Sequence, residues 1–381
     1  MKWLNHLAVV TAIMLPWPTF AAEPEVGESS LTIGMSAPLS GPNGAYGVEM
    51  QESIQAYFEQ INKAGGINGR KLNLVTLDDG YETERTVANT KTLLKEKNAF
   101  ALLSYYGSSP TTEAMNNVFG PAKVPLVGTI SGANTLREAS SANPNARYMF
   151  NVRASYADEA EVMVNHLVAL GLRSFAVFYQ NDGFGKSGLD GISAALKKHN
   201  LAPVAVGTVE RNSLDVSKAV EAIAKTTPQT VIMVTLYKPT AAFVRAMKKI
   251  NQNPMFMTLS PVGTEQLLKE LGPEARGIGI SQVVPYPWND GLPVVREYQK
   301  LAGKSGNFSY YGLEGYLMAR TLVEGIKRSG RDLSRDKLVS TLESMGNVDL
   351  GGYRINYSPN THLGSRFVEL TVIGPGGKIL R

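Results

Sequence analysis

The feature that most restricts the fold of this chain is an alternation of short apolar runs with segments of helical periodicity, which begins at Leu31. In the first helical segment, Ile54, Phe58 and Ile61 recur on one helix face, and Gly65 and Gly66 end the pattern. Strands that are apolar on both faces and separated by helices are typical of parallel sheets covered on each side. The sequence therefore predicts an α/β fold. The strand-like runs are residues 31–36, 71–79, 99–104, 124–128, 148–152, 174–179, 202–209, 230–236 and 255–259.

The length predicts two doubly wound units rather than one open sheet, because 381 residues exceed the roughly 100 to 200 of one domain. A seam is expected at residues 142–161, where a loop rich in Asn and Pro leads into a strand and then into a helix beginning near Tyr156. The C-terminal third is expected to complete both units. It holds a Pro-rich stretch at 280–293, helices at 293–303, 310–330 and 334–345, and hairpin-like segments at 351–359 and 365–374.

The N-terminus is typical of an export signal. Lys2 precedes an apolar run that is too short to span a bilayer, and small residues follow. We expect a signal peptide at residues 1–21, cleavage near Ala21 and Ala22, a tether at 22–30, and a periplasmic location.

The absence of cysteine excludes disulfides and thiolate metal sites. The net charge of +5 comes from scattered Lys and Arg, which indicates a mild attraction for anions and no nucleic-acid partner.

The motifs of common enzymes are incomplete. The segment 183–188 resembles the end of a phosphate-binding loop, but Gln180 stands where its first glycine is needed, so we expect a turn capped by Asp182. The four histidines have no metal-ligand spacing, and no base is evident for Ser131 as a nucleophile. We therefore expect no enzymatic activity, no metal and no cofactor. A secreted hydrolase that uses Ser131 or Ser108 is kept as an alternative.

Polar and small residues follow the strand that we expect to end at Ser104. Gly107 permits close approach to the backbone, Ser108 and Ser109 offer hydroxyls, and the next helix presents unpaired N–H groups that favour an anion. Pro110 is suited to the first turn of that helix. In a plainer interpretation, Ser108 or Ser109 only caps the helix.

Similar turns follow other strands, at residues 36–47 and 124–138 in the first half and at 179–185, 235–241 and 258–263 in the second. The carboxyl ends of parallel strands lie along one edge of a sheet, where ligands of open α/β proteins bind. Phe184, Tyr237 and Ser260 are available at the strand ends of the second half. We expect two facing walls with a ligand between them.

Segments 33–79, 151–191 and 313–326 resemble the periplasmic solute-binding proteins of ABC importers, in the leucine/isoleucine/valine-binding group. The resemblance covers nearly all of the mature chain in order. It implies the type I periplasmic binding fold, with two Rossmann-like, doubly wound lobes joined by three crossovers. Residues 31–153 and 284–357 would form one lobe, and residues 154–283 and 358–381 the other.

The resemblance also implies a set of ligand-binding residues. Ser108 and Ser109, with the turn of Ile130, Ser131 and Gly132, would bind a ligand carboxylate. Aromatic side chains would surround the rest of the ligand, namely Tyr46, Tyr106, Tyr156, Phe184 and Tyr311, with Tyr237 on the opposing lobe.

Two features depart from that family. A cysteine pair common in the amino-acid binders is absent near Tyr81 and Gly107, and Ser260 stands where those relatives carry the acid that binds the ligand ammonium. Because a buried ammonium needs a carboxylate, the ligand could be a carboxylate without an amine or a small amide, unless Glu314 or Glu265 substitutes.

The expected function is capture of a small organic solute by hinge closure and its presentation to the membrane permease of an ABC importer, by a monomeric protein. A sensory subunit that reports its occupied state to a receptor or kinase is an alternative that the sequence leaves open.

Overall fold

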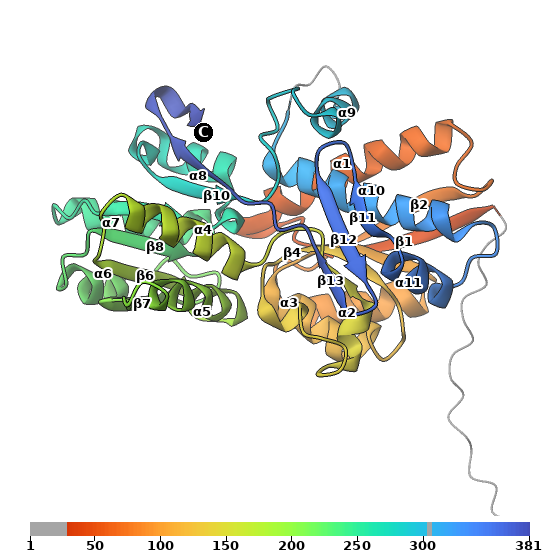
Figure 1. Cartoon of the computed structure of the whole chain (residues 1–381), viewed down its shortest axis with the longest axis horizontal. Helices are drawn as coiled ribbons and strands as arrows, with labels where there is room; N and C mark the ends of the chain where they lie inside the picture. Colours follow the sequence, from red (N-terminus) through yellow and green to blue (C-terminus); the bar gives the residue numbers. More distant parts are fainter. Residues whose placement is uncertain (1–28, 303–306) are drawn as a thin grey trace, which may run out of the picture.

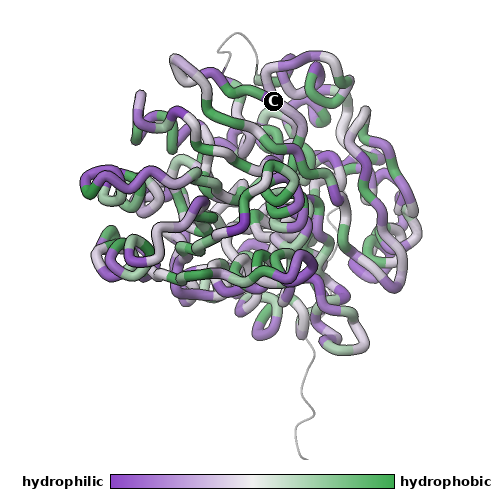
Figure 2. The backbone as a smooth tube through the Cα atoms, turned by 60° about the vertical axis from the view of Figure 1, so that its left-hand side comes forward, coloured by the Kyte–Doolittle hydropathy of each residue, from purple (hydrophilic) through white to green (hydrophobic). Residues whose placement is uncertain are grey.

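The computed structural model describes residues 29–302 and 307–381. The expected signal peptide and residues 22–28 of the expected tether lie outside the described residues. Hydrophobic and hydrophilic stretches alternate along the described chain (Figure 2). Within these ranges, no helix combines the length and the apolar content needed to cross a bilayer.

The first sheet contains five parallel strands, in the spatial order β2 (Lys71–Asp78), β1 (Ser30–Ala37), β3 (Ala101–Tyr106), β4 (Leu126–Ile130) and β5 (Met149–Phe150). Every residue of β3 and β4 is buried, as expected for strands that are apolar on both faces. The helices of this half are α1 (Gly44–Lys63), α2 (Thr83–Lys95), α3 (Ser108–Ala114), α9 (Pro293–Ala302), α10 (Tyr310–Ser329) and α11 (Arg335–Glu343).

Helices α1 and α10 pack against each other, and α10 also contacts β3 and β4. Their close approach depends on Gly315, because a Cβ atom there would lie 3.0 Å from the Met50 backbone. As a result, the residues of the first turns of α10 lie beside the carboxyl ends of β3 and β4.

The second sheet contains seven strands, in the order β15 (Ile379–Leu380), β14 (Glu369–Ile373), β10 (Gly279–Gln282), β9 (Met255–Thr258), β8 (Thr230–Val234), β6 (Phe175–Gln180) and β7 (Ala205–Val209). β14 runs antiparallel to β10, while the strands from β10 to β7 are parallel. Parallel sheets flanked by helices confirm the predicted α/β class. The helices of this half are α4 (Tyr156–Ala169), α5 (Gly183–Lys197), α6 (Ser217–Ala224), α7 (Tyr237–Lys249) and α8 (Thr264–Leu271).

Some local predictions were wrong. β3 continues to Tyr106 instead of ending at Ser104, since both tyrosines are buried between layers like the residues before them. No strand was predicted at the start of the Pro-rich stretch 280–293, yet its first residues belong to β10, because a four-residue strand is too short to show a period. The expectation of a hairpin at 351–359 is confirmed: β12 (Arg354–Ser358) pairs antiparallel with β11 (Gly346–Asp349) and β13 (Thr361–Gly364), in a separate sheet.

The two sheets lie side by side, with the second sheet and helices α4 to α8 in the left half of Figure 1 and the first sheet in the right half. The chain passes between the halves after β5, after β10 and after β13. Because β13 pairs with β12 and contacts β5, residues 361–364 still lie beside the first sheet. The predicted lobe boundaries stay a prediction.

Candidate ligand-binding site

The loops after the strands of the two sheets contact each other between the lobes. The hydroxyl of Tyr46, on α1, donates to the carbonyl oxygen of Val262 at 2.7 Å, and the hydroxyl of Tyr311, on α10, donates to that of Pro261 at 2.9 Å. Pro261 and Val262 follow β9. The lobes are therefore closed on each other at the edge where the sequence predicts the site.

Three buried hydroxyl groups, here called the hydroxyl cluster, meet at this edge. The Ser108 Oγ lies 2.8 Å from the Ser131 Oγ and 3.4 Å from the Tyr156 Oη. Ser108 begins α3, Ser131 follows β4 and Tyr156 begins α4. All three side chains are at most 1% exposed. Hydroxyl groups can each donate one hydrogen bond, so the cluster is suited to a carboxylate or another polar oxygen.

The neighbouring predicted residues build the turns around this cluster. The carbonyl of Ile130 accepts from the Gly107 N–H at 3.2 Å, and that of Gly132 accepts from the Tyr156 N–H at 2.9 Å. The Ser109 Oγ accepts from the N–H of Gly183, in the other lobe, at 3.1 Å. The interpretation of Ser108 or Ser109 as a simple cap is wrong, because the capping position is Gly107 and no side chain caps α3.

Three tyrosines, here called the aromatic cluster, stand beside the hydroxyl cluster. The Tyr46 ring lies 5.5 Å from that of Tyr106 and 4.5 Å from that of Tyr311 between centroids. Tyr237 meets the edge of Tyr46 at 5.8 Å, and Phe184 lies 5.2 Å from Tyr156. All the predicted aromatic residues are thus gathered at one place. The Tyr106 Oη is buried without a hydrogen-bond partner among the described residues.

Tyr81, in the turn after β2, borders the aromatic cluster, although no binding role was predicted for it from the sequence. Its ring lies edge-on to Tyr106 at 5.2 Å and packs so closely on Gly107 that a Cβ there would be 2.5 Å from the ring. From the second lobe, Gln180 donates to its hydroxyl at 3.0 Å, and the Arg211 guanidinium lies 5.1 Å from its ring centroid. An aromatic contact therefore occupies the place of the absent cysteine pair. The position of Tyr81 directly after a strand was the available signal.

Three buried charged residues, here called the charged cluster, lie near Tyr156, whose ring centroid is 6.0 Å from the Arg153 guanidinium. They are Arg153, Glu159 and Glu314, with side chains 1%, 0% and 6% exposed. The Arg153 Nη2 donates to the Glu159 Oε1 at 3.0 Å, and its Nη1 lies 3.5 Å from the Glu314 Oε2. Ser260 is bound to this cluster: its hydroxyl accepts from Arg153, and its N–H donates to the Glu159 Oε2 at 2.8 Å.

The charges in the cluster respond differently to burial. Burial raises the pKa of Glu314 to about 7, although the attraction of Arg153 opposes the rise. Burial also disfavours the charge of Arg153, but Glu314 and Glu159 outweigh it and keep its pKa above the ordinary value. Arg153 and Glu159 were missed by sequence reasoning, since a single Arg and Glu beside a helix start are common on surfaces. Glu265, the other acid considered, instead lines a separate cavity of about 440 Å³ with Glu49.

Arg137 holds the turn after β4 against the first crossover. Its Nη1 donates to the carbonyls of Ser131 and Ala133 at 3.1 and 3.2 Å. Its Nη2 donates to those of Arg153 and Ala154 at 3.0 and 3.3 Å. One side chain thus fixes the hydroxyl cluster relative to the segment that joins the lobes.

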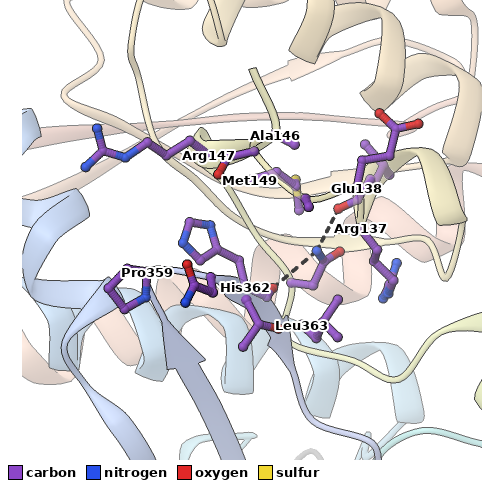
Figure 3. A pocket seen from close by; sticks show the side chains of 14 residues that line it. Arg137, Glu138, Ala146, Arg147, Met149, Pro359, His362 and Leu363 are labelled. Carbon is purple, nitrogen blue, oxygen red and sulfur yellow. Dashed lines mark hydrogen bonds between the residues drawn. The ribbon is translucent and has the colours of Figure 1, made fainter. Parts of the chain in front are cut away.

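A further cavity, of about 120 Å³, lies between β5 and β13 (Figure 3). Asn151 is among the residues that line it and donates to the carbonyls of Leu136 and His362 at 2.8 and 3.3 Å. The His362 ring stacks on Phe150, and its Nε2 lies 3.6 Å from the Glu343 Oε1. The contacts of this histidine are therefore away from the candidate site. Within the described ranges, no three His, Cys, Asp or Glu side chains form a group that could hold a metal ion.

Comparison with known proteins gives consistent matches. The family model described as "Periplasmic binding protein" matches residues 30–378. An "Amino acid binding protein" of Pseudomonas aeruginosa is 25% identical over 310 residues, 79% of each chain. "Leu/Ile/Val-binding protein homolog 3" of Brucella melitensis is 29% identical over 199 residues, half of each chain.

Solved structures match nearly the whole chain. A possible leucine/isoleucine/valine-binding protein from Rhodopirellula baltica has a TM-score of 0.86 and 32% identity, covering 93% of this chain and 97% of that one. A substrate-binding periplasmic protein from Ralstonia solanacearum has a TM-score of 0.84 and 30% identity, covering 92% and 99%. A branched-chain amino acid ABC transporter protein from Thermus thermophilus with bound valine shares the fold, with a TM-score of 0.80 and 17% identity, covering 93% and 96%.

Proposed function

This chain belongs to the periplasmic binding protein family, and from that premise we propose that it captures a small organic solute between its lobes and delivers it to the permease of an ABC importer. The observation that carries the proposal is the convergence of Ser108 and Ser131 of the first lobe with Tyr156 of the second, at the edge where the two lobes are closed on each other. We assign the solute carboxylate, or a similar polar oxygen, to this hydroxyl cluster.

The aromatic side chains around the hydroxyl cluster favour a solute with an apolar or aromatic portion. The aromatic cluster borders the hydroxyl cluster, and Phe184 packs on Tyr156 within the second lobe. Aromatic rings bury large apolar areas and can also face a cation. Names of the relatives point in the same direction: an amino acid binding protein and Leu/Ile/Val-binding homologues.

Closure of the lobes is the step that links binding to delivery. A solute between the lobes adds contacts only in the closed form and so shifts the population toward it. Hydrogen bonds from Tyr46 and Tyr311 to the opposing strand-end turn stabilise that form. We propose a monomer with hinge segments near residues 153, 283 and the third crossover, exported to the periplasm, with the closed form recognised by the permease.

The first test identifies the solute. Protein purified under native conditions from its own cell envelope is unfolded, and the released small molecules are identified by mass spectrometry. We expect one organic solute with a carboxylate or a related polar group. Release of no small molecule, together with no stabilisation by any carboxylate in a thermal-shift panel, would contradict the proposal.

The second test concerns the hydroxyl cluster. Ser108→Ala should weaken binding of the identified solute by about 1 to 3 kcal/mol, because a charged partner loses a hydrogen bond. Titration calorimetry measures the change. The control is Ser329→Ala, which removes another buried serine whose hydroxyl bonds within α10. Equal affinities of wild type and Ser108→Ala for the solute would contradict the assignment of the hydroxyl cluster to the binding site.

A further inference from the structure

We propose that closure of the two lobes takes up a proton on Glu265, so that an acidic medium favours the closed form over the open one. The proposal rests on hinge closure, which is part of the proposed function, but not on the identity of the solute. It starts from the cavity of about 440 Å³ that lies where α8 of the second half meets α1 and α10 of the first.

The residues that line this cavity come almost entirely from the first half of the molecule. They lie on α1, on α9, on α10 and in the few residues just before α10. Among the described residues that line the cavity, only Glu265 of α8 comes from the second half. Closure of the lobes therefore moves the Glu265 carboxyl out of water and into a cavity of the opposite lobe.

The cavity already contains acidic groups before Glu265 enters it. Glu49 and Glu52 of α1 line it, and no Lys, Arg or His stands among its described lining residues. Gln266 of α8 donates to the Glu49 Oε1 at 2.6 Å. The Tyr310 N–H donates to the Glu265 Oε1 at 3.0 Å. The Oε2 atoms of Glu49 and Glu265 are buried without a hydrogen-bond partner in the part of the chain that the structure describes.

Other titratable groups around the cavity offer no compensating charge. Burial raises the pKa of the Tyr298 hydroxyl to about 12 and also raises that of Tyr310, so both rings stay neutral. Lys269, on α8 itself, is exposed, and the Arg381 guanidinium is paired with Glu369. Two ionised carboxylates would therefore face this cavity without a cation beside them, which is costly in a buried place.

The open and closed forms therefore differ in the pKa of Glu265. In the closed form burial, and then the like charge of Glu49, raises this pKa to about 7. In the open form the carboxyl returns to water, where its ordinary pKa is 4.5. Burial raises the pKa of Glu49 as well, but hydrogen bonds from Ser309 and Gln266 oppose that rise, so the proton is placed on Glu265. Between the two pKa values of Glu265, closure should weaken by up to about tenfold for each unit of rising pH.

A reversible disulfide between the lobes measures closure without a solute. The chain has no cysteine, and a Cβ atom at Gly183 would lie 3.8 Å from the Ser109 Cβ, which is the separation found in disulfides. The two-cysteine protein, with Ser109→Cys and Gly183→Cys, is freed of solute by unfolding and refolding. It is then equilibrated with reduced and oxidised glutathione from about pH 5 to about pH 8, with EDTA so that no divalent cation replaces the proton. After an acid quench, mass spectrometry gives the ratio of disulfide to dithiol, which follows the closed population.

The ratio in the two-cysteine protein should fall by about tenfold or more from the lowest to the highest pH. Adding Glu265→Gln, which keeps the size of the side chain but cannot ionise, should hold the ratio constant within about twofold. The control is Asp79→Asn. Burial raises the pKa of Asp79 to about 6, but its carboxylate accepts from Ser36 and Thr86 within the first half. Its loss should leave the pH dependence of the ratio unchanged, and circular dichroism checks the fold of each variant.

Three results would overturn proton-linked closure. These are a ratio that does not change with pH, an equal fall with and without Glu265→Gln, and a fall that Asp79→Asn abolishes as well. In each case the cysteines still oxidise, so the lobes close and the proposed function stands. If the cysteines stay reduced at every pH, even with the solute that the native protein releases, the lobes do not close and the proposed function itself fails.

Discussion

At the scale of single residues, this site depends on side chains whose neighbours come from distant parts of the chain. Gly107 is the clearest case. Its φ of +92° lies in the left-handed region, and its missing Cβ leaves room for the Tyr81 ring. Gly107 therefore permits the backbone turn and also leaves room for the Tyr81 ring beside the aromatic cluster.

Gly107→Ala should lower the free energy of unfolding by more than the cost of the backbone conformation alone, about 1 to 3 kcal/mol, because the Tyr81 ring must also move. Urea denaturation measures the change. Gly171→Ala is the matched control, since Gly171 has a φ of +90° and no atom within 4 Å of the position of a Cβ. Equal losses in both variants would show that contact with the ring costs nothing.

At the scale of elements, the pattern of apolar runs predicted the main strands and helices well. Asp182 caps α5 as expected, accepting from the N–H groups of Phe184 and Gly185, and α4 begins at Tyr156. The short strand β10 was missed, because four residues carry too little periodicity to outweigh the prolines that follow. The turn after β4 is held by Arg137, whose four carbonyl partners no local pattern reveals.

Arg137→Met should lower the free energy of unfolding by at least about 2 kcal/mol, because buried carbonyls lose a charged donor. It should also weaken solute binding, since the Ser131 turn is no longer fixed to the crossover. Urea denaturation and calorimetry measure the two effects. Arg245→Met serves as the control: Arg245 is exposed and pairs with Glu270 and Glu274, so its loss should cost less than about 1 kcal/mol. Equal effects of both variants would contradict the role of Arg137.

At the scale of the whole molecule, polar contacts between the lobes accompany the closed arrangement. Arg211 donates to the Thr83 hydroxyl at 2.9 Å, and Asn212 donates to Glu82 at 2.6 Å. At another contact between the lobes, the carboxylate of Glu265, on α8, accepts from the N–H of Tyr310 at 3.0 Å. Burial, and then the like charge of Glu49, raises the pKa of Glu265 to about 7.

This raised pKa predicts that stability depends on pH. A carboxyl whose pKa is higher in the folded protein than in the unfolded chain binds more protons when folded, so its contribution is complete below its ordinary pKa of 4.5 and is lost as the pH rises through about 7. Glu314, with a pKa also raised to about 7, adds to the same trend. Thermal stability should therefore fall between pH 5 and pH 8, and Glu265→Gln should reduce that slope. An unchanged slope in melts across this range would show that Glu265 does not titrate between the two states.

The order of residues along the chain was enough to predict the α/β class and the strand ends at which Ser108 and Ser131 lie. Both follow from local periodicity and from the rule that parallel strands end at one edge. Only the folded molecule brings Arg153, Glu159, Ser260 and Glu314 together. These residues belong to separate segments whose contacts depend on how the chain crosses between the lobes and how closely α1 and α10 pack. A buried charge has no periodic signature, because its cost and its partners arise only when distant segments exclude water from the same place.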